Sequence, residues 1–555
     1  MLAFAFGQLA GLARNILVAH AFGASADLDA FLAANRVSET LFNLIAGGAL
    51  GSAFIPTFTT LLAKEDRVGA WKLASAVANL AVLILGALAA LAAIFAPQIV
   101  SYLLAPGFST DPAQFMLTVS LLRIQLVSAV LFGLSGLVMG ILNSHQVFLV
   151  PALTPSMYQF GLIFGVLAIA PHFGIYGLAY GVLIGAALHL LLQIPSLAKL
   201  PSPPSTLHAP RSTLHAPPST LHAPRSTPHP PRSTPHAPRP SAPHPLPKYT
   251  PTLGLDNPAV GEVIRLMGPR LLGVAVVQLN FWVNTWLASN MAEGSVSGIS
   301  YGFALMLMAQ AAIAQSIATA AMPTLSSQYA LGKLYDIRRS LAAALRGVLL
   351  LSLPASLGLI ILRVPLIQLL YQRGSFDVHD TQLVAWALFW YAAGLVGHSL
   401  LEVLARAFYA MHDTKTPVLV GVAAMTLNVI FSFGFSTLFA RLGWLPLGGL
   451  ALANSLATAL EAATLFILMR MRLKSLEGKT VALGGIQSAM ATLAMSAVLW
   501  GWLRLTADRP AWLSAGGGVI LGVGVYGVTA LVLGIREVKG VISVIHQRIV
   551  KRISG

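Results

Sequence analysis

Long apolar runs separated by short polar segments dominate the pattern of hydrophobic and polar positions along this chain. Clear examples are residues 73–96, 271–288 and 481–503. A helix of about 20 residues crosses a hydrocarbon core about 30 Å thick, so each of these runs is long enough to span a bilayer. Because backbone amides in a bilayer must be satisfied within their own segment, we expect the runs to be helices.

The whole pattern predicts fourteen membrane-spanning helices with mostly short connections. They are expected at residues 1–22, 36–62, 72–98, 115–142, 147–170, 174–198, 259–290, 296–325, 343–364, 381–410, 416–439, 445–469, 481–503 and 512–535. The first run has neither a cationic leader nor a small-residue cleavage site, so we interpret it as a span rather than a removed signal peptide. The predicted fold class is an all-α polytopic membrane protein.

The chain also carries an internal repeat, in which four landmarks recur in the same order at offsets of 266 or 267 residues. The pairs are Pro56 with Pro323, Gly107 with Gly374, His145 with His412, and Pro151 with Pro417. Six spans in each half give both halves the same orientation, as in parallel transporter repeats. The sequence thus predicts two parallel six-helix halves, 1–198 and 259–472, plus two C-terminal helices within 473–535.

The composition and charge of the chain exclude the classes of soluble protein. The chain is 56% hydrophobic and only 9% charged, whereas an average soluble chain carries about 25% charged residues. It has no cysteine, which excludes disulfide scaffolds and thiolate metal sites. Of its 34 Lys and Arg residues, 22 lie in segments that are cytoplasmic if both termini face the cytoplasm, and five lie on the opposite side. This asymmetry predicts a multi-pass protein of the cytoplasmic (inner) membrane with both termini inside, and it explains the net charge of +16 without a nucleic-acid partner.

Two polar segments interrupt or follow the spans. The segment 199–258 repeats proline-rich heptads with histidines seven residues apart, namely His208, His215, His222, His229 and His236. Proline at this density favours an extended disordered cytoplasmic linker over the alternative, a histidine-rich metal tract, and we predict no metal site. The basic tail 536–555 either lies on anionic membrane lipids or frays in the cytoplasm.

Charged side chains inside the first two spans are the main candidates for function. A basic side chain at the bilayer centre costs about 2.5–3.5 kcal/mol on insertion scales. If the second helix extends back to Asp29, two turns place Asp29 and Arg36 on one face. Together with Arg14 they form either a polar cluster on a cavity wall or charge pairs that lock two helices. Glu39, three residues after Arg36, favours the second interpretation, and the sequence leaves both open.

The second half contains further polar residues within its spans. Glu402 and Arg406 stand four residues apart and are expected to form a structural ion pair rather than a coupling site. Glu461 has no obvious partner; it either accepts a proton or cation or hydrogen-bonds a neighbouring helix. Asn280 and Asn284 share one face of the seventh predicted span, where polar side chains join helices or line a cavity.

No pattern in the sequence indicates covalent catalysis. A phosphate-binding glycine loop, a metal-ligand helix motif and a serine nucleophile elbow are all missing from a credible context. We therefore expect a membrane transporter that is not an enzyme and that needs no cofactor.

Several stretches resemble one family. They are ARNILVAHAFGASADLDAF at 13–31, ILNSHQVFLVPALTPSMYQ at 141–159, LMGPRLLGVAVVQLNFWVNT at 266–285 and ARAFYAMHDTKTPV at 405–418. Together they resemble the MurJ (MviN) family of lipid II flippases of peptidoglycan synthesis, within the superfamily that holds the MATE exporters. The resemblance covers almost the whole chain except the linker.

The resemblance implies alternating access, with a central cationic cavity that takes a lipid-linked glycan diphosphate and two extra helices that hold its polyprenyl tail. Arg14, Asp29 and Arg36 occupy positions of functional cavity charges, and Gln278 and Asn284 stand in the matching seventh-span stretch. Arginine suits a diphosphate because its planar fork binds two oxygens at once. The family also implies cell-wall synthesis enzymes as partners.

The chain departs from the family at several cavity positions. Gln8 and Phe42 stand where the family usually carries arginine, and Ala304 and Leu307 replace charged side chains of the eighth span. The expected function is lipid II transport across the cytoplasmic membrane. The alternatives are transport of another lipid-linked glycan, MATE-like export of small molecules, and a non-transporting membrane scaffold of wall synthesis.

Overall fold

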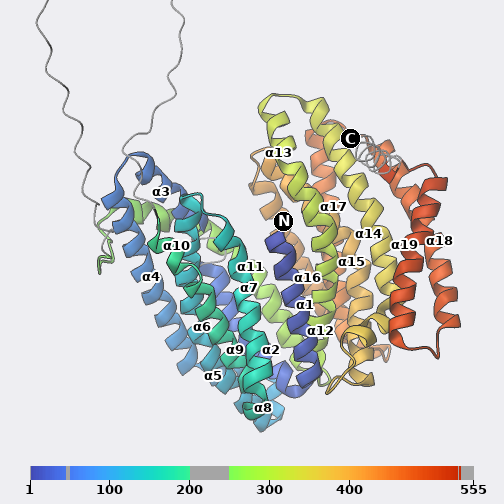
Figure 1. The fold of residues 1–555 in the computed structure, drawn as a ribbon, viewed down its shortest axis with the longest axis horizontal. Helices are drawn as coiled ribbons and strands as arrows, with labels where there is room; N and C mark the ends of the chain where they lie inside the picture. The colour runs from blue at the N-terminus through green and yellow to red at the C-terminus, as the bar shows by residue number, and fades with distance from the viewer. Residues whose placement is uncertain (1, 46–50, 201–248, 536, 539–555) are drawn as a thin grey trace, which may run out of the picture.

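The computed structural model describes residues 2–45, 51–200, 249–535 and 537–538. Most of the predicted linker and of the basic tail lie outside the described residues, and so does part of the second predicted span. The described residues form helices and no strand. In Figure 1 the helices form two bundles side by side, with α18 and α19 on the flank of the second bundle.

The first bundle, here the N-lobe, contains residues 2–200. Its elements are α1 (Leu2–Phe22), α2 (Ala26–Ile45), α3 (Gly51–Ala63), α4 (Arg67–Ile94), α5 (Ala96–Gln98), a π-helical turn (Ile99–Leu104), a 3-10 turn (Pro106–Thr110), α6 (Pro112–Ser144), α7 (Leu149–Phe164), a second π-helical turn (Gly165–Ile169), α8 (Ala170–Phe173), α9 (Tyr176–Leu191) and α10 (Ile194–Ala198).

The second bundle, the C-lobe, follows the linker. It contains α11 (Pro258–Ser289), α12 (Ser295–Gln310), a π-helical turn (Ala311–Gln315), α13 (Ser316–Ala330), α14 (Leu334–Leu370), α15 (Val378–Ala410), α16 (Lys415–Arg441) and α17 (Leu447–Arg472). The C-terminal pair is α18 (Gly478–Leu505) and α19 (Gly518–Val532), the latter preceded by a π-helical turn (Leu513–Gly517). The Tyr526 hydroxyl donates to the Leu350 carbonyl at 2.6 Å and ties α19 to α14.

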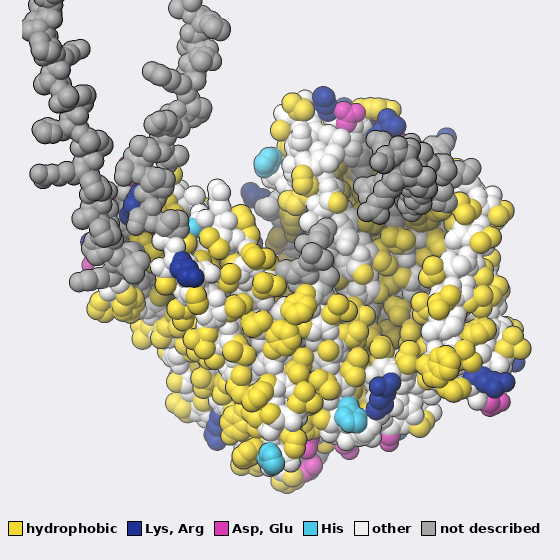
Figure 2. Space-filling model, viewed as in Figure 1, with side chains coloured by type: hydrophobic (Ala, Val, Ile, Leu, Met, Phe, Trp, Pro, Cys, Tyr) yellow, Lys and Arg dark blue, Asp and Glu magenta, His cyan; other side chains and the backbone are white. Residues whose placement is uncertain are grey.

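The predicted fold class is confirmed. Among the described residues, 11 helices are long and apolar enough to cross a membrane. Helices α1, α2 with α3, and α11 lie over the remaining three predicted spans, so the number fourteen stays a prediction. Hydrophobic side chains cover the flanks of both lobes in Figure 2, while charged side chains gather toward the two ends, as a bilayer requires.

Helices begin where the sequence supplies caps. Asp111 precedes Pro112 and accepts a hydrogen bond from the Ala113 N–H at 2.9 Å, which starts α6. A proline at the first helical position needs no partner for its nitrogen, so this arrangement suits a helix start. Asp377 and Asp380 form a capping box at the start of α15. Local sequence therefore determines where these two long helices begin.

The lobes share one hydrophobic core at one end, and further cores lie at the other. The shared core includes Leu28 and Phe31 of α2 together with Val296 and Tyr301 of α12 and Leu383 of α15. At the opposite end there are two cores. Phe54 and Phe58 of the N-lobe pack with Val260 at the start of α11, whereas Leu341 and Phe408 belong to a core within the C-lobe. The shared core holds the lobes together at one end, and the lobes diverge away from it (Figure 1). We call the end with the shared core, which carries the α1–α2 turn, the sealed end.

At the sealed end, each half has a turn that contains a glycine and packs against the end of a helix of the other lobe. Gly107 packs so tightly against the end of α11 that a Cβ there would lie 1.9 Å from the Ser289 carbonyl oxygen. Gly374, with φ +62°, packs against the end of α1, where a Cβ would lie 2.4 Å from the His20 carbonyl oxygen. The sequence repeat that pairs these glycines thus corresponds to two equivalent contacts between the lobes.

Candidate functional site

A cavity lies between the lobes, beside the shared core. Its void volume, including the space at its mouth, is about 770 Å³. The lining comes from α1, α2, α7 and α9 of the N-lobe and α12 of the C-lobe, namely Arg14, Asn15, Val18, Leu28, Phe31, Leu32, Asn35, Arg36, Glu39, Tyr158, Leu162, Leu178, Ser300, Tyr301 and Ala304. The cavity therefore combines an apolar wall with a few polar groups that converge on it, as ligand sites do.

Arg14 reaches this cavity from the middle of α1. Its Nε and Nη2 donate to the Asn15 side-chain oxygen at 3.2 and 2.7 Å. This partner is neutral, so the guanidinium keeps its full positive charge inside the cavity. A half-buried cation of this kind attracts an anionic ligand more strongly than one in open water, because the surrounding dielectric is lower.

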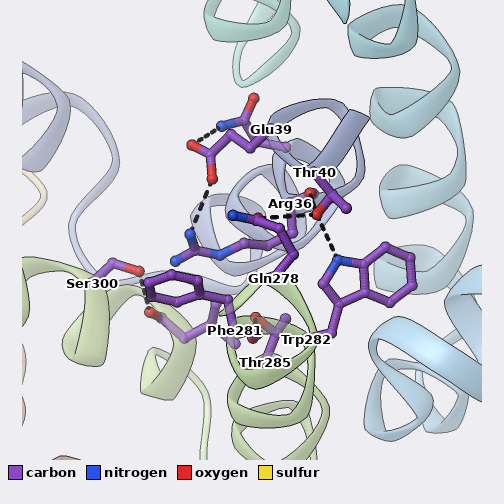
Figure 3. Close-up of polar contacts among 10 residues, drawn as sticks. Arg36, Glu39, Thr40, Gln278, Phe281, Trp282, Thr285 and Ser300 are labelled. Atoms are coloured by element: carbon purple, nitrogen blue, oxygen red, sulfur yellow. Dashed lines mark hydrogen bonds and ion pairs between the residues drawn. The ribbon is translucent and has the colours of Figure 1, made fainter. Parts of the chain in front are cut away.

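Arg36 lines the same cavity from α2, and Figure 3 shows its side chain between Glu39 and Phe281. Its Nη1 lies 3.0 Å from Oε2 of Glu39, one turn further along the helix. The guanidinium carbon lies 5.1 Å from the ring centroid of Phe281 on α11, so the cation also faces an aromatic ring of the C-lobe. Asn35 donates to the other carboxylate oxygen of Glu39 at 2.7 Å.

A second chamber of about 430 Å³ adjoins the first, and Arg36 and Ser300 line both. Its other walls are C-lobe side chains that include Phe281, Asn284 and Tyr391. Asn284 is held by its neighbours, since it donates to the Asn280 side-chain oxygen at 3.3 Å and accepts from the Ser432 hydroxyl at 3.2 Å. Arg36 thus stands at the junction of the two chambers.

Gln278 lies at the contact between α2 and α11 and is buried. Its side-chain oxygen accepts from the Thr40 hydroxyl at 3.3 Å, and Trp282 Nε1 donates to the same hydroxyl at 2.8 Å (Figure 3). Gln278 is not among the residues that line the two chambers. Its position indicates a contact between the lobes.

The structure separates Asp29 from the two arginines, although α2 does extend back far enough to include it. Asp29 is only 2% exposed, and its carboxylate accepts from the Gly294 N–H at 2.9 Å and from the N–H and hydroxyl of Ser297, both at 2.7 Å. These donors belong to the start of α12, where the helix dipole attracts a negative charge. Asp29 therefore joins the lobes at the sealed end.

The charged candidates of the second half lie away from both chambers. Arg406 Nη2 lies 2.5 Å from Glu402 Oε1, so the two side chains form an ion pair along α15. Glu461 of α17 is buried, and its Oε2 has no hydrogen-bond partner among the described residues. No group of three or more His, Cys, Asp and Glu residues in the described part of the chain is arranged to hold a metal ion.

Sequence reasoning missed the aromatic part of the site. Tyr158 and Tyr301 line the larger cavity and Phe281 lines the smaller one. Phe281 and Tyr301 lie in apolar stretches whose periodicity shows that they are helical but not what they face. Tyr158 and Phe281 both fall within stretches that carry the family resemblance, at 141–159 and 266–285, and that resemblance is the signal that could have pointed to them.

Comparison with known proteins decides the family. Residues 18–513 match the family model described as Lipid II flippase MurJ. The chain belongs to the MurJ family. The lipid II flippase MurJ of Burkholderia cenocepacia is 29% identical to it over 84% of this chain and 81% of that relative. The probable lipid II flippase MurJ of Vibrio cholerae is also 29% identical, over 95% of this chain and 94% of the relative.

Solved structures agree with this assignment. A lipid II flippase MurJ in an inward closed conformation superposes with a TM-score of 0.75 at 25% identity, covering 96% of this chain and 97% of the other. An inward-facing MATE family multidrug resistance transporter superposes with a TM-score of 0.63 at 16% identity, covering 85% and 96%. The second match shows a shared fold only. The expectation of a multi-pass membrane protein from a transporter family is thus confirmed.

The cavity of this MurJ family member has fewer charged side chains than the family resemblance implies. Ala304 lines it where the family resemblance implies a charged side chain. Phe42, at a position where arginine is usual in the family, packs its ring 5.0 Å from the ring of Phe132 inside the N-lobe. Gln8 is exposed and is not among the lining residues. Arg14 and Arg36 are therefore the cations of the described cavity wall.

Proposed function

We propose that this chain moves lipid II across the cytoplasmic membrane by alternating access, with the diphosphate of the lipid held by Arg14 and Arg36. The observation that carries the proposal is that these two guanidinium groups, from two different helices, line one cavity between the lobes. Planar guanidinium groups bind phosphate oxygens through paired, charge-assisted hydrogen bonds. A cavity with two of them and an apolar wall suits a lipid-linked diphosphate.

The closed and open ends of the molecule support a direction of access. Basic residues are concentrated on the side of the linker and the chain termini, which the positive-inside rule places in the cytoplasm. The sealed end is then the outer end, and the cavity receives the headgroup from the cytoplasmic side. Release outside requires the shared core at the sealed end to separate and the lobes to meet at the other end.

Further roles follow for the other candidate residues and segments. Asn284 offers an amide to the glycan in the smaller chamber, and Gln278 and Asp29 position the lobes. Glu402 and Arg406 form a structural pair, while Glu461 is a coupling or structural carboxylate. Helices α18 and α19 hold the polyprenyl tail, the segment 199–258 connects the two lobes, and the cytoplasmic face meets cell-wall synthesis enzymes. No step of this cycle requires covalent catalysis or a cofactor.

Complementation tests the proposal in cells. Depleting the host's own lipid II flippase halts wall synthesis, and we expect a well-expressed copy of this chain to restore growth. Arg14→Gln and Arg36→Gln variants at equal membrane levels should restore it poorly or not at all. Failure of the unsubstituted chain to rescue growth would contradict lipid II as the cargo.

A second candidate function is transport of another polyprenyl-diphosphate-linked glycan. It is favoured by the weak net charge of the larger cavity, where the charged lining among the described residues is Arg14, Arg36 and Glu39. Binding of purified protein to lipid II and to undecaprenyl-diphosphate-linked sugars separates the two candidates. Tighter binding of lipid II supports the first, and binding of neither class would favour a MATE-like exporter or a scaffold.

A further inference from the structure

The two cavity arginines differ in how they are neutralised. Arg36 Nη1 lies 3.0 Å from the Glu39 carboxylate, whereas the partner of Arg14 is the neutral side-chain oxygen of Asn15. Glu39 lines the same cavity as both arginines. A diphosphate that bound both guanidinium groups would therefore meet a carboxylate at contact distance, and like charges at that range repel strongly.

The carboxylate is freer to move than the guanidinium it neutralises. The Arg36 side chain is 24% exposed and stacks over Phe281, and its Nε is buried with no hydrogen-bond partner among the described residues. The Glu39 side chain is 42% exposed and faces the cavity, where its other contact is the hydrogen bond from Asn35 at 2.7 Å. Rotation about the Glu39 side-chain bonds would remove its charge from Arg36 while the guanidinium stays in place.

We propose that Glu39 is an internal counter-ion that occupies Arg36 in the empty cavity, yields it to the substrate diphosphate, and takes it back as the substrate leaves. The inference rests on the proposed function, because it needs a diphosphate as the competitor. Exchange of one anion for another keeps Arg36 neutralised in both states. Glu39 therefore weakens binding and speeds release, as a transporter that must let go of its cargo requires.

Glu39→Gln tests the exchange directly, since the amide keeps the size of the side chain and removes its charge. We expect the Kd of the purified variant for lipid II in nanodiscs to fall by about tenfold relative to the unsubstituted chain, because a like charge beside the bound diphosphate is removed. Most of this change should lie in slower dissociation. Glu39→Ala, with the same expected direction, replaces the amide variant if that variant fails to fold.

Glu402→Gln is the matched control. It removes a carboxylate from a similar glutamate–arginine pair, with Arg406 four residues away, outside both chambers. It changes the net charge by the same amount, so its affinity for lipid II should stay unchanged. Arg36→Gln should weaken binding, because it removes one of the two guanidinium groups that hold the diphosphate.

The outcomes separate this inference from the proposed function. If the unsubstituted chain binds lipid II and Glu39→Gln binds it equally well or more weakly, the counter-ion role is wrong and the proposed function stands. If Glu39→Gln and Glu402→Gln tighten binding equally, the effect belongs to net charge and the inference is also wrong. If no variant binds lipid II or undecaprenyl diphosphate, the proposed function itself fails.

Discussion

The carboxylate of Asp29 joins the two lobes at the start of α12. Asp29 of the N-lobe is buried and receives its hydrogen bonds from Gly294 and Ser297 of the C-lobe. The first amide groups of a helix have no partner inside the helix, so a carboxylate placed there satisfies them and interacts favourably with the helix dipole. At the residue scale, Asp29 stabilises the sealed conformation, while Arg14 and Arg36 supply charge to the cavity.

We expect Asp29→Ala to weaken the sealed end, because it leaves buried donors at the start of α12 unpaired. The loss should be about 1–3 kcal/mol and should lower the thermal unfolding temperature of the purified protein. Asp27→Ala is the control, since Asp27 lies in the same first turn of α2 but is exposed. Equal unfolding temperatures for the two variants, measured by tryptophan fluorescence, would show that Asp29 does not hold the lobes together.

The sequence could predict the charged residues of the site but not their surroundings. Arg14 and Arg36 stand out because charge is expensive inside a span, and the structure brings them to one cavity. Asp29 was grouped with Arg36 because seven residues make two helical turns, yet the two side chains meet different neighbours. What lies opposite a helix face, such as Phe281 over Arg36 or Gly294 beside Asp29, depends on packing between segments far apart in the chain.

At the scale of elements, the start of α16 depends on one half-buried side chain, Asp413. Asp413 accepts from the Thr416 N–H at 3.0 Å and from its hydroxyl at 2.8 Å, and it also pairs with Arg472. The Thr416 N–H and then the other Thr416 and Arg472 contacts lower the pKa of Asp413 below its ordinary value. The deprotonated side chain therefore caps α16 in the loop after α15.

We expect Asp413→Ala to destabilise the protein by about 0.5–2 kcal/mol, the usual loss on removing a helix cap. Asp413→Asn should lose less, because the amide oxygen still accepts from Thr416. A lowered pKa means that the stabilisation is complete above the ordinary carboxyl value of 3.8 and disappears as the pH falls through the lower value. Unfolding temperatures that fail to differ at pH 7, or that converge already at pH 6, would contradict this assignment.

Helices were the most predictable elements, because a bilayer leaves an apolar run few alternatives. The observed α6 and α15 agree with the predicted runs 115–142 and 381–410 to within a turn. The start of α2 was placed ten residues too late, since Asp27 and Asp29 make its first turns polar. Those carboxylates favour a helix N-terminus, and hydrophobicity alone does not register that signal.

At the scale of the whole molecule, the sealed end depends on close contacts between the halves that side chains larger than glycine would block. Gly374 illustrates this, because an added Cβ would overlap the His20 backbone while the Ser375 N–H donates to the His20 carbonyl at 2.9 Å. Its counterpart Gly107 meets Ser289 of α11 in the same way. The repeated halves therefore close on each other through equivalent turns.

Gly374→Ala should shift the protein away from the sealed conformation. Spin labels on cysteines introduced at the exposed residues Asp27 and His379 would report the separation of the lobes, and the chain has no cysteine of its own. We expect longer and broader distances in the variant. Gly443→Ala is the control, because Gly443 has a similar φ of +73° but open space around it. Identical distances for both variants would show that the turn does not hold the seal.

The most direct measurement of the central claim is lipid II movement in proteoliposomes that contain only this protein. Fluorescent lipid II placed in the inner leaflet should become accessible to an external quencher when the unsubstituted chain is present. It should stay inaccessible with a folded Arg14→Gln/Arg36→Gln double variant. Movement at the same rate with both proteins, or with neither above the rate of empty vesicles, would contradict the account.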